Sequence, residues 1–89
     1  MAKPKIVAYL NPMCPWTPGV VRTLQEHGLE FESKDVMRDR KAYQEMVDKS
    51  GQYSTPSVEI DGQMLADVGG DEVDAWLRQK GYVGSEAAG

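Results

Sequence analysis

The sequence predicts one α/β domain in which a four-stranded mixed sheet is flanked by three helices, in the order β-α-β-α-β-β-α. An apolar, β-rich segment near the start of the chain is followed by segments with alternating helical and strand-like patterns. Farther along, two short alternating segments surround an Asp-Gly pair, which is typical of a tight antiparallel hairpin. Eighty-nine residues with 40% hydrophobic content support one small core. We expect the domain to span residues 1–82, followed by a flexible C-terminal tail over residues 83–89.

The first elements are a strand, a helix and a second strand. Residues 5–10, "KIVAYL", predict a buried strand that stops at a turn. Apolar residues at helical spacing predict a helix over residues 18–27, and Gly28 is placed to end it in a left-handed conformation. Residues 29–36 alternate apolar and charged side chains, which favours a half-buried strand.

The second helix and the hairpin follow. Asp39 is the expected N-cap of a helix that ends at Gly51. Its buried face is expected to comprise Ala42, Tyr43, Met46 and Val47. Residues 56–68 then form two short strands joined by a turn at Asp61-Gly62.

The last helix completes the predicted fold. It is capped by Asp71, ends at Gly81 and buries Val73, Trp76 and Leu77. A β-α-β unit crosses over right-handed and gives parallel strands, and the hairpin extends the same sheet in the antiparallel sense. The expected sheet is therefore mixed.

Composition limits the partners and the compartment. A net charge of −4 and a pI near 4.8 argue against nucleic acid, because neutralising phosphates requires a basic face. No segment reaches the run of about 20 apolar residues that crosses a bilayer, and the first residues are interrupted too early for a signal peptide. One cysteine cannot form an internal disulfide, as is typical of a reducing compartment. We expect a cytoplasmic protein that binds neither nucleic acid nor membrane, and we expect a monomer.

The lone thiol, Cys14, lies in a loop with prolines at positions 12, 15 and 18. A lone cysteine can be a small buried hydrophobe. This position favours reactivity instead, because α/β sheets commonly bind ligands at helix N-termini beyond strand ends, where the helix dipole favours the nucleophilic thiolate. The prolines also leave the loop few conformations to lose on binding. Either Pro15 is the first helical residue, or Thr17 is the N-cap and Pro18 follows it.

Three spaced motifs resemble those of the glutaredoxins, in the thioredoxin-fold superfamily. They are Cys14-Pro15-Trp16-Thr17, "SGQYSTPSVEIDG" at 50–62 and "VGGDE" at 68–72, and the resemblance extends from residue 5 to residue 80. Each motif also has a local explanation as a turn, a cap or the start of a strand, but together their spacing favours the family. The resemblance implies a thioredoxin-like fold and a glutathione-dependent thiol–disulfide oxidoreductase.

The resemblance also implies roles for individual residues. Pro56 matches a proline that is cis and lies against the reactive cysteine, and the backbone of Thr55 would pair with glutathione as an added strand. Gln52 would hold the glycine carboxylate, and Trp16 would form an apolar wall beside the sulfur. At the last helix the γ-glutamyl end would be received by Gly70, Asp71 and Glu72, with Gly69-Gly70 leaving room for close backbone approach.

Two residues depart from the family pattern. Thr17 stands in place of the second cysteine of the Cys-x-x-Cys motif, so Cys14 would act by a monothiol mechanism. Asn11 stands where the family usually has a lysine that stabilises the thiolate and binds a glutathione carboxylate. The loss of this cation weakens both effects.

The first hypothesis is therefore a deglutathionylating enzyme with glutathione as co-substrate and no metal cofactor. Cys14 attacks the glutathionyl sulfur of a mixed disulfide, the substrate thiol leaves, and a second glutathione restores Cys14. One alternative is an iron–sulfur cluster carrier, in which a dimer holds the cluster through one cysteine and one glutathione per subunit; Pro15 stiffens the loop and argues against it. The other alternative is a redox-silent binding domain that keeps the fold.

Other polar residues have structural explanations. His27 is expected at the far end of the first helix from Cys14, where it favours the helix C-terminus rather than acting as a base. Residues 38–41, "RDRK", fit a solvated helix start. A hairpin turn, a strand edge and a cap explain Asp61, Asp67, Asp71 and Asp74, so no metal site is predicted from side chains.

Overall fold

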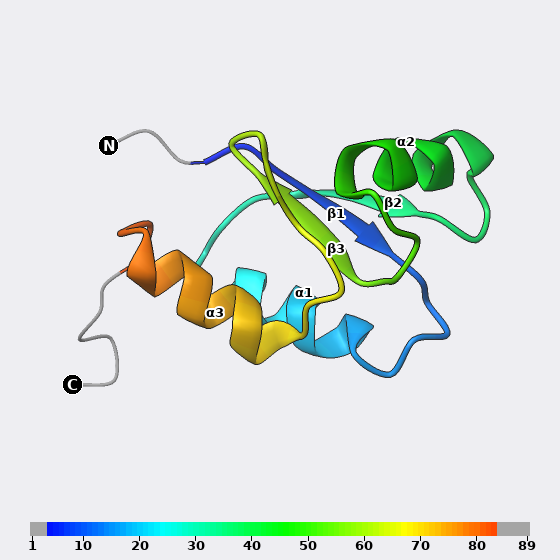
Figure 1. Ribbon diagram of the computed structural model, residues 1–89. Coiled ribbons are helices and arrows are strands. Elements are labelled where there is room, and N and C mark those ends of the chain that lie inside the picture. The colour runs from blue at the N-terminus through cyan, green and yellow to red at the C-terminus, as the bar shows by residue number, and fades with distance from the viewer. Residues whose placement is uncertain (1–3, 84–89) are drawn as a thin grey trace.

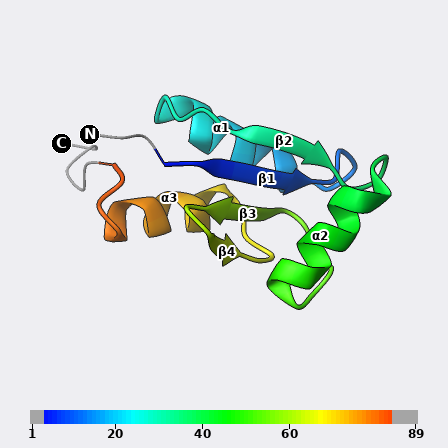
Figure 2. The same ribbon diagram turned by 90° about the horizontal axis from the view of Figure 1, so that it is seen from above.

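The computed structural model describes residues 4–83 and confirms the predicted order of strands and helices (Figures 1 and 2). The strands are β1 (Ile6–Leu10), β2 (Glu32–Asp35), β3 (Ser57–Ile60) and β4 (Gln63–Leu65). The helices are α1 (Thr17–Glu26), α2 (Arg40–Ser50) and α3 (Gly70–Gln79). The sheet order is β2-β1-β3-β4, with β1 parallel to β2 and antiparallel to β3. The hairpin partners β3 and β4 are antiparallel, so the sheet is mixed.

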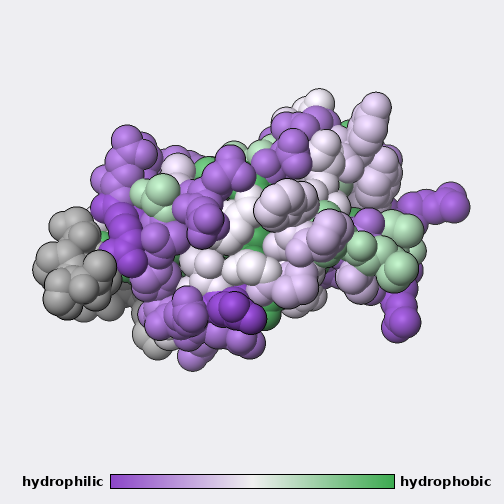
Figure 3. Space-filling model, turned by 90° about the horizontal axis from the view of Figure 1, so that it is seen from below, coloured by the Kyte–Doolittle hydropathy of each residue, from purple (hydrophilic) through white to green (hydrophobic). Residues whose placement is uncertain are grey.

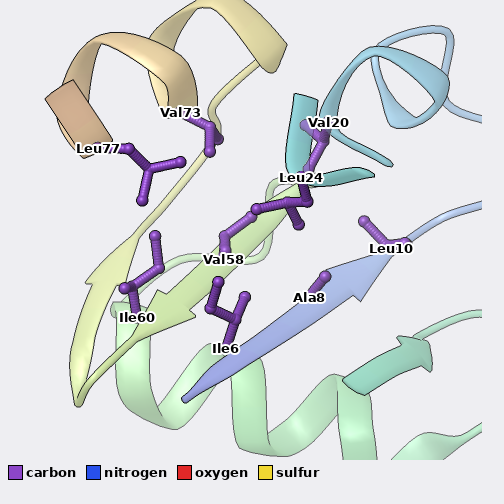
Figure 4. Close-up of a cluster of buried hydrophobic side chains, with 9 residues drawn as sticks. All are labelled: Ile6, Ala8, Leu10, Val20, Leu24, Val58, Ile60, Val73 and Leu77. Atoms are coloured by element: carbon purple, nitrogen blue, oxygen red, sulfur yellow. The ribbon is translucent and has the colours of Figure 1, made fainter. Parts of the chain in front are cut away.

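The central strand β1 carries side chains into two separate cores. In Figure 1, α1 and α3 lie on one side of the sheet and α2 lies on the other. On the first side, alternate residues of β1 join a cluster that also contains residues of β3, α1 and α3 (Figure 4): Ile6, Ala8, Leu10, Val20, Leu24, Val58, Ile60, Val73 and Leu77. On the second side, the intervening residues join the cluster under α2: Val7, Tyr9, Val36, Ala42 and Met46. This period of two follows from the pleat of a strand that is covered on both faces.

The second strand is shorter than the segment predicted for it. Residues 29–31 precede β2, and Leu29 completes the end of α1. The backbone N–H of Leu29 donates to Leu24 O at 3.0 Å and that of Gly28 donates to Gln25 O at 3.0 Å, the pair of bonds of a Schellman motif. Gly28 has a φ of 67°, as predicted. The apolar side chain of Leu29 packs on the core under α1 rather than belonging to the sheet.

The start of α1 lies two residues after the first predicted alternative, Pro15, and one residue before the second, in which Thr17 is the N-cap. Trp16 is the N-cap, Thr17 is the first helical residue and Pro18 is the second. Pro15 therefore precedes the helix. The missing N–H of Pro18 has no consequence at this position, because the first N–H groups of a helix have no partner within it.

The second helix and the hairpin agree with their predictions, except at one side chain. Asp39 caps α2 by accepting hydrogen bonds from the N–H groups of Lys41 and Ala42, and Gly51 ends it with a φ of 75°. Tyr43, predicted to be buried, is exposed. The hairpin turn has φ values of 50° at Asp61 and 85° at Gly62, as a two-residue turn of the type I′ class requires.

The N-cap of the last helix lies two residues before the predicted cap. Gly69 is the N-cap, and its N–H donates to Glu72 Oε1 at 3.0 Å, so Asp71 lies in the first turn instead of capping the helix. Val73 and Leu77 are fully buried, whereas Trp76, predicted to be buried, is only partly buried and stacks on Tyr82. Gly81 follows the helix with a φ of 81°. Val83 packs against the core, and the rest of the predicted tail, residues 84–89, lies outside the described residues.

Candidate functional site

The loop between β1 and α1 holds Cys14 in a fixed frame of hydrogen bonds. Asn11 organises this frame: its side-chain Oδ1 accepts from the N–H of Met13 at 2.9 Å, and its carbonyl accepts from the N–H of Cys14 at 2.9 Å. The same carbonyl accepts from Thr17 Oγ1 at 2.8 Å. Thr17 also donates its N–H to the carbonyl of Cys14 at 3.2 Å. The two residues that depart from the family pattern therefore shape the loop that carries the sulfur.

The sulfur of Cys14 lies beside the loop that precedes β3. Its Sγ is 3.7 Å from the carbonyl oxygen of Thr55, to which the thiol donates. The Thr55–Pro56 peptide bond is cis, as the resemblance implied. Cys14 is neither sealed in the core nor fully exposed, whereas Pro56 is fully buried. A sulfur in this position can be reached from solvent on one side, while its other side contacts the backbone carbonyl of Thr55.

A pocket of about 790 Å³ lies next to this pair of loops, between α1 and the start of α3. Near the sulfur it is lined by Pro15, Trp16 and Pro56. Elsewhere its walls come from one face of α1 and from the segment between β4 and α3: Gly19, Arg22, Thr23, Glu26, Asp67, Val68, Gly69, Gly70, Asp71 and Glu72. Figure 3 shows the molecule from the side of α1 and α3, with weakly polar and apolar residues across the middle of the face and strongly hydrophilic residues bordering them.

The segment from Asp67 to Gly70 is held to both neighbouring elements. The N–H of Val68 donates to the carbonyl of Pro56 at 3.0 Å, which fixes this wall of the pocket to the loop beside the sulfur. Gly70 is pressed against α1: a Cβ there would lie 2.5 Å from Gly19 O and 2.8 Å from Thr23 Oγ1. The space that a side chain at Gly70 would fill is thus occupied by α1, while Gly70 itself lines the pocket. Gly69 is less confined, with Trp16 Cε3 at 3.6 Å from a Cβ built there.

The structure brings most of the predicted site residues together. Trp16, Pro56, Gly70, Asp71 and Glu72 line the pocket, and Thr55 contacts the sulfur through its carbonyl. Glu72 is already engaged, because its carboxylate accepts the N–H of Gly69. Gln52 is the exception: it is exposed, does not line the pocket and bonds locally with Ser50 through its backbone.

Sequence reasoning missed one complete wall of the pocket. Gly19, Arg22, Thr23 and Glu26 all line it, and their spacing of three, four and seven residues places them on one face of a helix. This helical spacing could have indicated the polar wall, but only the apolar residues of the same helix were considered. Asp67 was also missed as a pocket residue; its φ of 57° places it at a sharp bend after β4.

The remaining polar candidates lie elsewhere or form structural contacts. His27 is the C-cap of α1, and its Nε2 is 2.5 Å from Asp74 Oδ1 on α3. Asp74 also accepts from Arg78 Nε at 2.8 Å. The hydrogen bond from Arg78, followed by the one from His27, lowers the pKa of the Asp74 carboxyl. Among residues 4–83 no three His, Cys, Asp or Glu side chains are grouped to hold a metal ion. No helix in the same part of the chain is long and apolar enough to span a membrane.

Comparison with known proteins gives consistent results. The family model described as Glutaredoxin matches residues 6–65. A curated relative from Clostridium pasteurianum, an uncharacterized glutaredoxin-like 8.6 kDa protein in a rubredoxin operon, is 30% identical over 74 residues, which are 83% of this chain and 99% of the relative.

Solved structures are similar over most of the chain. The crystal structure of the thioredoxin-like protein BC3987 has a TM-score of 0.73 at 31% identity, and the match covers 80% of this chain and 97% of that one. NrdH-redoxin from Escherichia coli, a glutaredoxin-like protein with a thioredoxin-like activity profile, has a TM-score of 0.66 at 21% identity, covering 80% of this chain and 92% of that one. At 21% identity, the similarity to NrdH-redoxin shows a shared fold and nothing more.

Proposed function

This chain belongs to the glutaredoxin family, and from that premise we propose that it is a glutathione-dependent thiol–disulfide oxidoreductase acting through Cys14 alone. Family membership and the thioredoxin-like fold support thiol redox chemistry in general. The dependence on glutathione and the monothiol mechanism are the further steps of the proposal.

One observation carries the proposal, namely the position of the only thiol in the chain. The sulfur of Cys14 is 3.7 Å from the carbonyl of Thr55, directly before a cis proline, and the neighbouring residues Pro15 and Trp16 line a pocket large enough for a small thiol ligand. A cysteine that served only to fill the core would have no reason to lie beside a pocket at the N-terminal end of a helix.

The chemistry is an exchange of one disulfide for another. The thiolate of Cys14 attacks the glutathionyl sulfur of a mixed disulfide, and the bond to the substrate sulfur breaks as the new S–S bond forms. The substrate sulfur leaves with the electron pair and takes up a proton from solvent. A second glutathione thiolate then attacks the glutathionyl sulfur on Cys14, which returns Cys14 to its reduced form and releases oxidised glutathione.

The monothiol mechanism fits the structure around position 17. Thr17 occupies the first turn of α1 and uses its hydroxyl and N–H to hold Asn11 and Cys14, so no side chain at this position can displace glutathione from Cys14. Release of the intermediate would depend on an external thiol. We accordingly propose a cytoplasmic role, where reduced glutathione is available.

The direct test is glutathione-linked turnover of a small glutathionylated disulfide by the wild type, with Cys14→Ser as the inactive control. We expect turnover by the wild type and loss of all of it in Cys14→Ser. Exposure of both proteins to oxidised glutathione, followed by mass measurement, should give one glutathione adduct on the wild type and none on the variant. Thr17→Cys restores a dithiol motif and tests whether the scaffold supports exchange at all.

The outcomes separate the proposal from its alternatives. Absence of turnover and of adduct in both wild type and Thr17→Cys would leave the redox-silent binding domain. Turnover with a dithiol reductant but never with glutathione would keep the redox activity and remove the glutathione dependence. A coloured dimer after anaerobic reconstitution with iron and sulfide would support the cluster carrier.

A further inference from the structure

The surface around Cys14 combines exposed apolar side chains with carboxylates that form no ion pair within residues 4–83. Five large apolar side chains are strongly exposed among residues 4–83, and three of them lie within two residues of Cys14 or Thr55. These three are Met13, 83% exposed, Trp16, 65% exposed, and Tyr53, 72% exposed. The segments that carry them meet where the thiol of Cys14 contacts the carbonyl of Thr55, and exposed apolar side chains that share one region mark an interaction surface more often than scattered ones do. We call these three residues the apolar rim.

The pocket next to the apolar rim has a strongly acidic lining. Four carboxylates line it, and a single guanidinium, that of Arg22, accompanies them: Glu26, Asp67, Asp71 and Glu72. Within residues 4–83 none of the four carboxylates is paired with a lysine, arginine or histidine. Glu72 accepts a hydrogen bond from the N–H of Gly69, which leaves its charge in place. Clefts lined by one sign of charge raise the local concentration and the association rate of ligands of the opposite sign.

We propose, on the basis of the proposed function, a preference among substrates. The preferred substrates are glutathionylated or disulfide-bonded protein segments whose own cysteine is flanked by Lys or Arg and by apolar residues. The apolar flank lies on the rim of Met13, Trp16 and Tyr53. The basic flank lies against the carboxylates of Glu26 and Asp67, which leaves Asp71 to the γ-glutamyl end of glutathione. Acidic segments are disfavoured by the same charges, so the surface selects among substrates that present the same glutathionyl group.

The chemical step is unchanged by this selection. The Cys14 thiolate attacks the glutathionyl sulfur, the Sγ–S bond forms as the peptide S–S bond breaks, and the peptide sulfur leaves with the electron pair and is protonated by solvent. Cys14 is oxidised to the mixed disulfide as the peptide sulfur is reduced to a thiol, so this half-reaction needs no external oxidant or reductant. The charges act on the encounter, and therefore on the second-order rate constant rather than on the exchange itself.

The test uses two synthetic peptides of equal length that each carry one glutathionylated cysteine, flanked by Lys and Leu in the first and by Glu and Leu in the second. The release of peptide thiol by excess reduced protein is followed in a single turnover. Because the glutathionyl group is identical, the ratio of the two rate constants reports the flanking residues alone. At low salt we expect the basic peptide to react at least about tenfold faster, and we expect the ratio to fall toward one as salt shortens the screening length.

A variant that removes charge without touching the predicted glutathione contacts sharpens the test. Asp67→Asn and Glu26→Gln together conserve shape, and asparagine tolerates the positive φ of 57° at position 67. This double variant should lower the ratio severalfold. The matched control, Asp48→Asn with Glu32→Gln, removes the same charge from α2 and β2 and should leave the ratio unchanged.

The apolar rim has its own measurement. Tyr53→Ser should slow the basic Leu-flanked peptide severalfold and leave a Ser-flanked basic peptide unaffected, whereas Tyr43→Ser, on α2, should change neither.

Equal rates for the basic and acidic peptides at low salt, or the same change of ratio in the charge variant and its control, would overturn the inference while leaving the proposed function intact. Absence of thiol release from both peptides would remove the proposed function and this inference together.

Discussion

At the scale of single residues, the tightest constraint in the site is the absence of a side chain at Gly70. The backbone of α1 passes so close to the start of α3 that any Cβ would overlap with Gly19. This contact fixes one wall of the pocket relative to the helix that follows the reactive loop. A glycine that the family resemblance associates with ligand binding therefore also has a packing role.

We predict that Gly70→Ala lowers the free energy of unfolding by about 1–3 kcal/mol, the usual cost of overpacking a close contact. The reason is the 2.5 Å separation between the added Cβ and Gly19 O, which forces backbone to move. Urea denaturation measures the change. Gly69→Ala is the matched control, because a Cβ there meets its nearest atom at 3.6 Å, and its smaller loss should reflect only the N-cap preference for glycine over alanine. Losses of equal size in both variants would contradict this explanation.

At the scale of elements, each helix is fixed by a specific polar contact as well as by its buried face. The cap of α2 is the Asp39 side chain, whose Oδ1 accepts from Lys41 N at 3.0 Å and from Ala42 N at 3.2 Å. Between α1 and α3 the contact is that of His27 with Asp74. Between α2 and the sheet it is Glu45, which accepts from Tyr9 Oη and from Lys34 Nζ at 2.6 Å each.

We predict that Asp39→Ala costs about 1 kcal/mol of stability, because two N–H groups at the start of α2 lose their acceptor. Asp39→Ser retains a hydroxyl acceptor and should recover most of the loss. Circular dichroism during urea denaturation gives both values. A serine variant as unstable as the alanine variant would mean that the charge at the helix start, rather than the hydrogen bonds, is responsible.

The Glu45 contact predicts how stability depends on pH. Hydrogen bonds from Lys34 and then from Tyr9 lower the pKa of the Glu45 carboxyl from an ordinary 4.5 to about 2 in the folded protein. A depressed folded-state pKa stabilises the protein above the unfolded value, and this contribution disappears as pH falls from about 4.5 to about 2. Wild type should therefore lose more stability over this window than Glu45→Gln does. Unfolding free energies measured at closely spaced pH values test this, and parallel curves would refute it.

The prediction of elements from sequence succeeded where a local pattern had one structural solution. The Asp61-Gly62 turn, the Asp39 cap and the alternating pattern of the hairpin were identified correctly, because each depends on neighbouring residues alone. The start of β2 was misplaced because Leu29 alternates like a strand residue but belongs to the Schellman motif. The cap of α3 was misplaced because an aspartate was preferred to Gly69, whose N–H is bound by Glu72 one turn later.

At the scale of the whole molecule, the two ends of the described chain meet at the hairpin. Asp61 accepts from the N–H of Lys5 and from the hydroxyl of Tyr82, at 2.8 Å each. Tyr82 also stacks on Trp76, with ring centroids 5.6 Å apart and an interplanar angle of 15°. The segment after α3 is thus attached to both the hairpin and the last helix.

We predict that Tyr82→Phe lowers the free energy of unfolding by about 0.5–1.5 kcal/mol through loss of the hydrogen bond to Asp61. Tyr82→Ala should cost more, because it also removes the aromatic stacking on Trp76. Tryptophan fluorescence during denaturation measures both, and Tyr53→Phe, at an exposed tyrosine, is the control. If Tyr82→Phe matches its control, the hydrogen bond contributes nothing.

The limits of sequence reasoning at this scale come from contacts between distant residues. The parallel and antiparallel senses of the strands followed from the β-α-β unit and the hairpin, and the proximity of Cys14 to Thr55 followed from the family resemblance. The close approach of Gly70 to Gly19 could not be predicted, because the packing of α1 against α3 depends on contacts between residues far apart in the sequence within their shared core. The pocket wall formed by Arg22 and Glu26 depends on that approach.

The strand that leads to Cys14 is shared by both cores, and this has a consequence for local opening of the molecule. Because Val7 and Tyr9 are buried under α2 while Ile6 and Ala8 are buried under the other two helices, β1 cannot detach without breaching both layers. Amide protons of β1 should therefore exchange with solvent only through global unfolding, whereas those of Met13 and Cys14, which donate only to Asn11 within the next loop, should exchange through local opening of that loop. The sulfur of Cys14 is thus separated by one short loop from the strand whose amides should exchange most slowly.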